Sequence, residues 1–120
     1  MDKKVMFGWL RRLDGTSEFE EYIDELPCKD VAKLLAVISN TEEHGLLTAI
    51  KMQWIKKLED DLYELRSKQG SDIQRALYFH KADSEYLITH GFTKKSPKTP
   101  ENEIIHAKEL RRMYKEGKLK

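Results

Sequence analysis

The sequence has one cysteine, no long apolar run and almost no net charge, and each shortage excludes a class of protein. A single thiol, Cys28, cannot form an internal disulfide, so we expect no disulfide framework. No stretch approaches the ~20 consecutive apolar residues of a membrane-spanning helix, and the N-terminal residues lack an apolar run of signal-peptide length. We therefore expect a cytoplasmic protein that does not enter a membrane.

Common catalytic and metal-binding motifs are also missing. The sequence has no GxxxxGK(S/T), GxGxxG or GxSxG, which removes the motif-based reasons for a nucleotide-binding or serine-hydrolase function. Its four histidines show no HExxH or HxxxH spacing, and no CxxC occurs. We expect neither a metal ion nor a cofactor. Cys28 follows a proline and is better interpreted as a small buried apolar side chain than as a nucleophile.

Length and charge distribution suit one soluble domain, residues 1–120, with a local surplus of positive charge. The net charge is only +1, which argues against sequence-independent binding to nucleic acid. Residues 1–53 nevertheless hold 7 basic and 10 acidic residues, whereas residues 54–120 hold 15 and 11. Residues 66–98 alone hold 7 basic residues against 3 acidic ones. The positive charge is therefore concentrated in one segment.

The first part of the chain predicts a strand followed by a helical hairpin. Residues 3–10 alternate apolar and polar side chains, the pattern of a strand. Ser17 and Glu20 fit a capping box, in which each side chain bonds the backbone of the other. Pro27 ends or bends that helix, and apolar residues at helical spacing then continue until Gly45.

The second part predicts three strands and a closing helix. Residues 46–58 are mixed and predict an extended connection with a helical turn. Alternating runs then predict consecutive antiparallel strands at Leu62–Arg66, Ile73–Lys81 and Glu85–Phe92. Thr99 is the expected N-cap of the last helix and Pro100 its first residue, while residues 118–120 are expected to fray. This order of elements predicts an α+β fold with a small, mainly antiparallel sheet.

Two arginines on these strands are candidate anion ligands. Alternation places Arg75 on the same face as Leu77 and Phe79, and Arg66 occupies a comparable place on the preceding strand. Cations held at the edge of a core, without carboxylates among them, favour a polyanionic ligand such as RNA. Taken singly, each arginine has a simpler interpretation: Arg66 pairs with Glu64 or Asp72, and Arg75 is a solvated sheet residue.

The last predicted strand carries the remaining candidates. Alternation groups Tyr86, Ile88, His90 and Phe92 on one face. His90 suits acid–base chemistry, although a lone histidine is more often structural. Phe92 is either a core residue or a base-stacking platform, and the lysine pair at 94–95 is either a solvated loop or a phosphate contact.

Several segments together resemble a known family. LYELR, RALYF, LITHGFTKK, and KTP followed by EIIHAKEL are similar to the phage-derived HigB-like branch of the RelE/ParE superfamily, over about residues 56–114. The resemblance implies a RelE-like fold and a toxin of a type II toxin–antitoxin system that cleaves mRNA on the ribosome. It also implies metal-independent attack by the ribose 2′-hydroxyl and inhibition by a small helix-turn-helix antitoxin.

The resemblance also implies residue roles. Arg66 and Arg75 match basic positions on the sheet, and Lys94 and Lys95 match a basic motif at the end of the last strand. We interpret Arg66 and Arg75 as a phosphate clamp. The expected catalytic residues are Arg66, Arg75, Lys94 and His90. The expected RNA contacts are Lys95, Phe92, Tyr78, Lys68 and Lys98.

Other functions fit parts of this pattern. A ParE-like toxin directed at DNA gyrase shares the fold class but damages DNA and does not cleave mRNA. A non-enzymatic protein-binding domain would leave both mRNA and DNA intact. The acidic hairpin Ser17–Gly45, with Glu20, Glu21 and Asp24, is the expected antitoxin surface. A helix pair that packs only on its own sheet explains that hairpin equally well.

Overall fold

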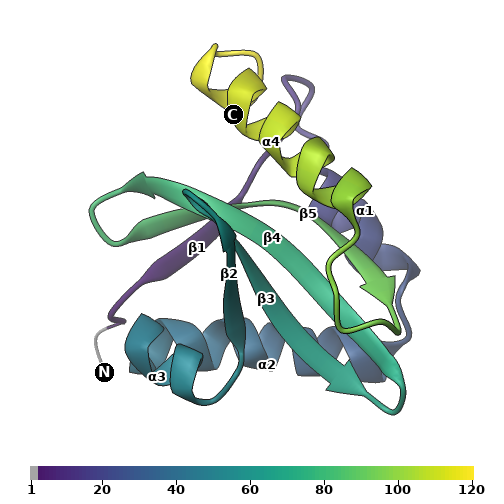
Figure 1. The fold of residues 1–120 in the computed structure, drawn as a ribbon. Coiled ribbons are helices and arrows are strands. Elements are labelled where there is room, and N and C mark those ends of the chain that lie inside the picture. Colours follow the sequence, from purple (N-terminus) through teal and green to yellow (C-terminus); the bar gives the residue numbers. More distant parts are fainter. Residues whose placement is uncertain (1–2) are drawn as a thin grey trace.

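The fold is built on a five-stranded sheet with helices on both faces, seen in a computed structural model that describes residues 3–120 (Figure 1). In chain order the elements are β1 (Met6–Trp9), α1 (Glu18–Glu25), α2 (Cys28–His44), α3 (Leu46–Lys51), β2 (Ile55–Glu59), β3 (Leu62–Gln69), β4 (Asp72–Ala82), β5 (Glu85–Lys94) and α4 (Glu101–Lys115). The strand order across the sheet is β1-β5-β4-β3-β2. Only β1 runs parallel to its neighbour, so the predicted α+β fold with a mainly antiparallel sheet is confirmed.

Helices cover the two faces of the sheet separately. The face covered by α1 and α2 packs Phe19, Leu34 and Ile38 against Leu65, Ala76 and Ile88. The opposite face packs α4 through Ala107 and Leu110 onto Leu62, Leu77, Phe79, Leu87 and Phe92. In Figure 1, α2 and α3 lie below the sheet and α4 lies above it. Within residues 3–120, no helix combines the length and the hydropathy that crossing a membrane requires.

Residues 46–58 form more structure than their sequence predicts. They contain the short helix α3 and the edge strand β2, joined through Gln53 in a left-handed conformation with φ of 62°. β2 is only five residues long and is held by pairing with β3, for example Ile55 opposite Leu65. A strand this short carries too little alternation to be recognised, because its partner strand supplies the ordering interaction.

The predicted helix caps are only partly correct. Ser17 caps α1 as expected, because its hydroxyl accepts a hydrogen bond from the Glu20 backbone N–H at 3.3 Å. Glu20 does not return the bond, since its carboxylate instead accepts from Trp9 Nε1 at 2.8 Å and from Arg11. Thr99 is not the cap of α4: Pro100 occupies that position, and the Thr99 hydroxyl donates to Glu64 at 2.6 Å.

Two further expectations about the ends of elements are wrong. The C-terminal tail is tied down, because Lys120 and Arg11 exchange backbone hydrogen bonds of 2.8 and 2.9 Å and Leu119 packs beside the α4 core. Cys28 is exposed rather than buried, since it is the first residue of α2 and lies in the solvent-facing first turn.

A β-bulge in β5 changes which side chains share a face. Ile88 lies opposite Tyr78, and His90 lies opposite the adjacent residue Leu77, so Thr89 is the extra residue. Ile88 therefore faces α1 and α2, whereas His90 contacts α4. The predicted common face for Tyr86, Ile88, His90 and Phe92 is wrong, because one inserted residue inverts the alternation after it.

Candidate nucleic-acid interface

Basic side chains gather at one end of the sheet face that α4 covers. Strand register places three rows of directly opposed residues across β3, β4 and β5: Glu64–Leu77–His90, Arg66–Arg75–Phe92, and Lys68–Ile73–Lys94. Opposed residues in antiparallel strands have Cβ atoms about 4.5–5.5 Å apart. The rows become more basic toward the end of β3, so the sheet concentrates positive charge there.

Arg75 lies at the centre of this face and is completely buried. Its guanidinium donates to the carbonyl oxygens of Ser96 and Lys98, the latter at 3.2 Å, and stands 5.9 Å from the centroid of the Phe92 ring. Burial lowers the pKa of Arg75, while the nearby Glu64 carboxylate, 3.8 Å away, opposes that shift. Arg75 is therefore a buried cation whose two terminal nitrogens already donate to the chain, while its Nε has no partner within residues 3–120.

Glu64 joins the two arginines to the segment that follows β5. One carboxylate oxygen accepts from Arg66 Nε and the other accepts from the Thr99 hydroxyl at 2.6 Å. Arg66 also donates to the carbonyl oxygen of Pro97. We call Glu64, Arg66, Arg75 and Thr99, together with the carbonyl oxygens of residues 96–98, the arginine cluster.

The arginine cluster corrects one expectation and confirms its alternative. The sequence predicted no carboxylate among the cations, but Glu64 lies there. Its side chain has no exposed surface and contacts Arg66 directly. The simpler interpretation of Arg66, a pair with Glu64, is confirmed. The simpler interpretation of Arg75, a solvated sheet residue, is wrong, because Arg75 is completely buried. Arg66 retains 21% exposure and can reach solvent, whereas a phosphate would reach Arg75 only after the 96–98 segment moved.

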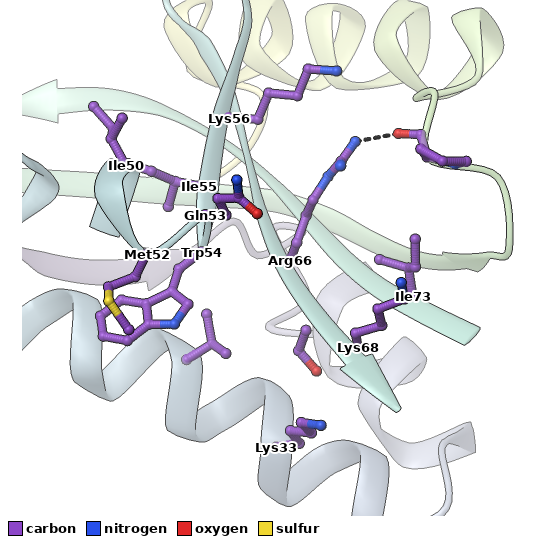
Figure 2. Close-up of a pocket in the computed structure, with 13 residues that line it drawn as sticks. Lys33, Ile50, Met52, Gln53, Trp54, Ile55, Lys56, Arg66, Lys68 and Ile73 are labelled. Carbon is purple, nitrogen blue, oxygen red and sulfur yellow. Dashed lines mark hydrogen bonds between the residues drawn. The ribbon is translucent and has the colours of Figure 1, made fainter. Parts of the chain in front are cut away.

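A notch opens beside Arg66, at the edge of the sheet (Figure 2). It has a volume of about 650 Å³. Its lining residues are Lys33, Val37, Ile50, Met52, Gln53, Trp54, Ile55, Lys56, Arg66, Ser67, Lys68, Ile73 and Pro97. Four of these are basic and none is acidic, so the notch suits an anionic ligand.

The unequal lengths of two neighbouring strands create the notch. β2 begins at Ile55, opposite Leu65, so the end of β3 at residues 67–69 is paired only with β4. The space that β2 leaves is bordered by α2 and by the turn after α3. In Figure 2, Lys56 and Arg66 extend to one side of the sheet, whereas Trp54 and Met52 extend toward α2. The notch therefore has a basic side and an apolar side.

The other predicted lysines lie near this basic end. Lys94 ends β5 and is separated from Lys68 by Ile73 in the same cross-strand row. Lys95 and Lys98 are exposed in the segment between β5 and α4. The structure thus brings Arg66, Lys68 and Lys94 to one face of the sheet, with the other two lysines on the adjoining segment.

His90 lies between the sheet and α4, away from the notch. Only 4% of its surface is exposed, and its ring nitrogens bond Glu103 at 3.1 Å and the Thr89 hydroxyl at 3.0 Å. Its ring also meets the edge of the His106 ring, and His106 in turn bonds Glu18 of α1 at 2.8 Å. Burial lowers the pKa of His90. In this geometry the imidazole connects β5 to α4 and does not face the cations of the notch.

Tyr78 and Phe92 are core residues in this structure. Tyr78 has no exposed surface and lies among aromatic rings on the α1–α2 face, where burial strongly raises its pKa. Phe92 is on the opposite face, between the Arg75 guanidinium and the His90 ring. Neither ring has a face open to a nucleotide.

Of the residues that line the notch, sequence reasoning named only Arg66 and Lys68 as site residues, and missed among others Lys33, Trp54 and Lys56. Lys56 lies on β2, the strand that the sequence did not predict, and Lys33 belongs to the distant helix α2. The surplus of positive charge after residue 54 was the available signal for Lys56. Across residues 3–120, no group of three or more histidine, cysteine or acidic side chains is arranged to hold a metal ion.

Comparison with known proteins identifies a family. A family model described as phage derived protein Gp49-like (DUF891) matches residues 21–112. The match runs from α1 to α4 and includes the arginine cluster and every residue that lines the notch. A search of curated proteins found no match. Because the family match covers most of the sequence, the chain belongs to the phage-derived Gp49-like family.

Proposed function

We propose that this protein is the toxin of a type II toxin–antitoxin system and cleaves mRNA on the ribosome. Membership of the Gp49-like family and the sequence resemblance to HigB-like toxins both support a toxin. The main observation in support of ribonuclease activity is the notch, which is lined by four basic side chains and no acidic one. Exposed cations beside a cavity suit a phosphodiester backbone.

The reaction we propose is internal transfer of the phosphodiester. The ribose 2′-oxygen attacks the adjacent phosphorus, the bond to the 5′-oxygen breaks, and the products are a 2′,3′-cyclic phosphate and a free 5′-hydroxyl. The proton lost by the 2′-hydroxyl is balanced by the proton gained at the 5′-oxygen. Charge builds up on the phosphate oxygens in the transition state, and we assign its stabilisation to Arg66, Lys56 and Lys68, which line the notch.

Arg75 and His90, the two predicted catalytic residues that are buried, take structural roles in this proposal. Arg75 holds the 96–98 segment through two carbonyl oxygens, and that segment supplies the Pro97 carbonyl that orients Arg66. His90 anchors α4 through Glu103. Lys94 adds positive charge from the same cross-strand row as Lys68, and Lys95 and Lys98 extend the RNA path.

A helix-turn-helix antitoxin is the partner we propose, with α1 as one contact surface. Glu20 and Glu21 of α1 are already paired with Arg11 and Arg12. Asp24 is exposed one turn further along the helix. Reversal of the Asp24 charge weakens neutralisation if α1 is the contact surface, and unchanged neutralisation in a co-expression assay would remove α1 from the proposal.

The function is tested by inducing the chain and mapping transcript ends. We expect new ends within translated messages and none on the same messages with the start codon removed. Damaged DNA with intact transcripts would indicate a gyrase-directed toxin, and normal growth with neither lesion would indicate a binding domain. Either outcome contradicts the proposal.

A pair of lysine variants connects the activity to the notch. Lys56→Gln combined with Lys68→Gln removes two notch cations, and we expect the cleavage rate to fall by roughly 10²-fold or more, by analogy with loss of one transition-state donor. Lys57→Gln is the matched control, because Lys57 is the next residue of β2 and does not line the notch. Equal activity of both variants would exclude the notch as the site of cleavage.

A further inference from the structure

Two polar side chains beside the notch have no hydrogen-bond partner among the described residues 3–120, although both are buried. Ser67 lines the notch and is 3% exposed, and its hydroxyl oxygen is unpartnered. Gln74 lies directly opposite Ser67 in the β3–β4 register and has no exposed surface. Neither the oxygen nor the nitrogen of its amide has a partner. An unsatisfied buried polar group destabilises a fold, so two such neighbours beside one cavity call for an explanation.

The position of Ser67 distinguishes it from other unpartnered groups. The Tyr78 hydroxyl is also unpartnered, but it lies within the aromatic cluster on the α1–α2 face and does not line the notch. Ser67 belongs to the part of β3 that β2 leaves uncovered. Ser67 therefore lines the cavity with its hydroxyl oxygen buried at the cavity wall, and Gln74 is its direct neighbour on β4, outside the lining.

The walls around Ser67 have the composition of a nucleobase site. Val37, Ile50, Met52 and Trp54 supply an apolar and aromatic side, and Figure 2 shows the Met52 and Trp54 side chains on the side facing α2. Bases stack on such surfaces, whereas their edges require donors and acceptors. The Ser67 hydroxyl supplies both kinds of group, because a hydroxyl can donate one hydrogen bond and accept others.

We propose that the notch holds one nucleotide of the RNA substrate and selects its base. The base enters the apolar side, where the Ser67 hydroxyl bonds its edge and the Gln74 amide positions that hydroxyl. The phosphates lie on the basic side, at Lys56 and Lys68. This inference rests on the proposed ribonuclease function and adds its specificity-determining residue, Ser67, and a positioning residue, Gln74.

An acidic peptide is a poorer match to the same cavity. Its carboxylates would satisfy the lysines, but its apolar side chains would leave the Ser67 hydroxyl and the Gln74 amide unpaired. A nucleotide satisfies the cations, the apolar wall and the Ser67 hydroxyl together.

Binding of single nucleotides tests the site without any cleavage. The four nucleoside 5′-monophosphates are titrated into the wild-type protein, and the side-chain amide signal of Gln74 is followed by NMR. We expect that signal to move on binding, with affinities that differ between the best and the worst base by roughly 5-fold or more. In Ser67→Ala and Gln74→Met the overall binding persists through the lysines, and the difference between bases shrinks toward unity.

Matched controls separate base selection from folding. Ser71→Ala and Gln69→Met change the same residue types at exposed positions outside the notch, so both keep the wild-type preference. Ser67→Ala removes an unpartnered hydroxyl, and we expect its midpoint of unfolding to equal or exceed that of the wild type. A lower midpoint with an unchanged base preference would mean that Ser67 has only a structural role, and would overturn the inference.

Mapping of cleavage ends distinguishes this inference from the proposed function. Wild-type protein that cuts translated mRNA with a base preference unchanged in Ser67→Ala and Gln74→Met would overturn base selection by the notch and leave the ribonuclease standing. Wild-type protein that binds nucleotides selectively but cuts no RNA would overturn the proposed function. Binding of a synthetic acidic peptide in preference to every nucleotide would overturn the nucleotide site itself.

Discussion

The arginine cluster and the notch both contain basic side chains, but those side chains differ in burial and in pairing. In the arginine cluster, Arg75 is fully buried and its guanidinium is bound by carbonyl oxygens and by the nearby Glu64. At the notch, Lys56 and Lys68 are exposed, and no ion pair involves either one within the described residues 3–120. Buried, paired charges are already occupied by their partners within the protein, whereas exposed, unpaired charges remain available to a ligand. The two regions meet at Arg66, which belongs to both.

Glu64→Gln should destabilise the arginine cluster more than any other variant we propose. The change keeps the size of the side chain but removes the negative charge beside Arg66 and Arg75. Loss of one partner from a buried ion pair costs about 3–5 kcal/mol, so we expect a decrease of that order in the free energy of unfolding. Urea denaturation measures it. The control is Glu59→Gln, at a partly exposed carboxylate that pairs with Lys108, and a similar loss in both variants would mean that burial is not the cause.

Thr99→Val should weaken the same cluster by less. Valine keeps the shape of threonine but cannot donate to Glu64, whose carboxylate then loses a hydrogen bond of 2.6 Å. Hydrogen bonds to charged groups contribute about 1.5–3 kcal/mol, and we expect a destabilisation within that range. Thr48→Val on the exposed surface of α3 is the control. If urea denaturation gave the same value for both, the Thr99–Glu64 bond would not stabilise the protein.

Acidification should lower the stability of the protein by less than these two substitutions, through His90, which anchors α4. Burial lowers the pKa of His90, so just below the usual histidine pKa of ~6.5 the unfolded chain binds a proton that the folded chain does not. Stability is therefore highest above that pH and decreases as the pH falls through it. Glu103, Glu18 and His106 surround the ring, the carboxylates opposing the shift and His106 adding to it.

Thermal unfolding between pH 7.5 and pH 5.5 measures the effect of His90. We expect His90→Gln to show a flatter pH dependence than the wild type, with the exposed His44→Gln variant retaining the wild-type slope. An unchanged slope in His90→Gln would show that another group titrates with unfolding.

Lys68→Gln should leave the free energy of unfolding almost unchanged. It should instead weaken the binding of a ligand at the notch. An exposed lysine without an ion pair contributes within about 0.5 kcal/mol to stability. If Lys68 contacts phosphate, the variant lowers the slope of log K against log salt for single-stranded RNA by about 0.7. Fluorescence titration with RNA at several salt concentrations measures this slope. Lys57→Gln is the control, and equal slopes for the two variants would remove Lys68 from the RNA contact.

Most of the architecture was predictable from local patterns. The strands around Arg66, Arg75 and His90 have clear alternation, and Ser17 caps its helix as expected. The site was less predictable. Lys56 was missed because β2 depends on pairing with β3, and His90 was assigned to the wrong set of neighbours because the bulge at Thr89 inverts the alternation.

The sequence alone determined the α+β order of elements, the basic segment around residues 66–98 and the family resemblance. These features are local: periodicity, capping and composition act over a few residues. Only the tertiary structure decided which cations are buried and which are exposed, because that depends on contacts between distant residues. Glu64 and Thr99, 35 residues apart, meet over the arginines, and α2 closes the notch from the far side of the sheet. Long-range packing therefore divided one run of positive charge into a structural cluster and an open site.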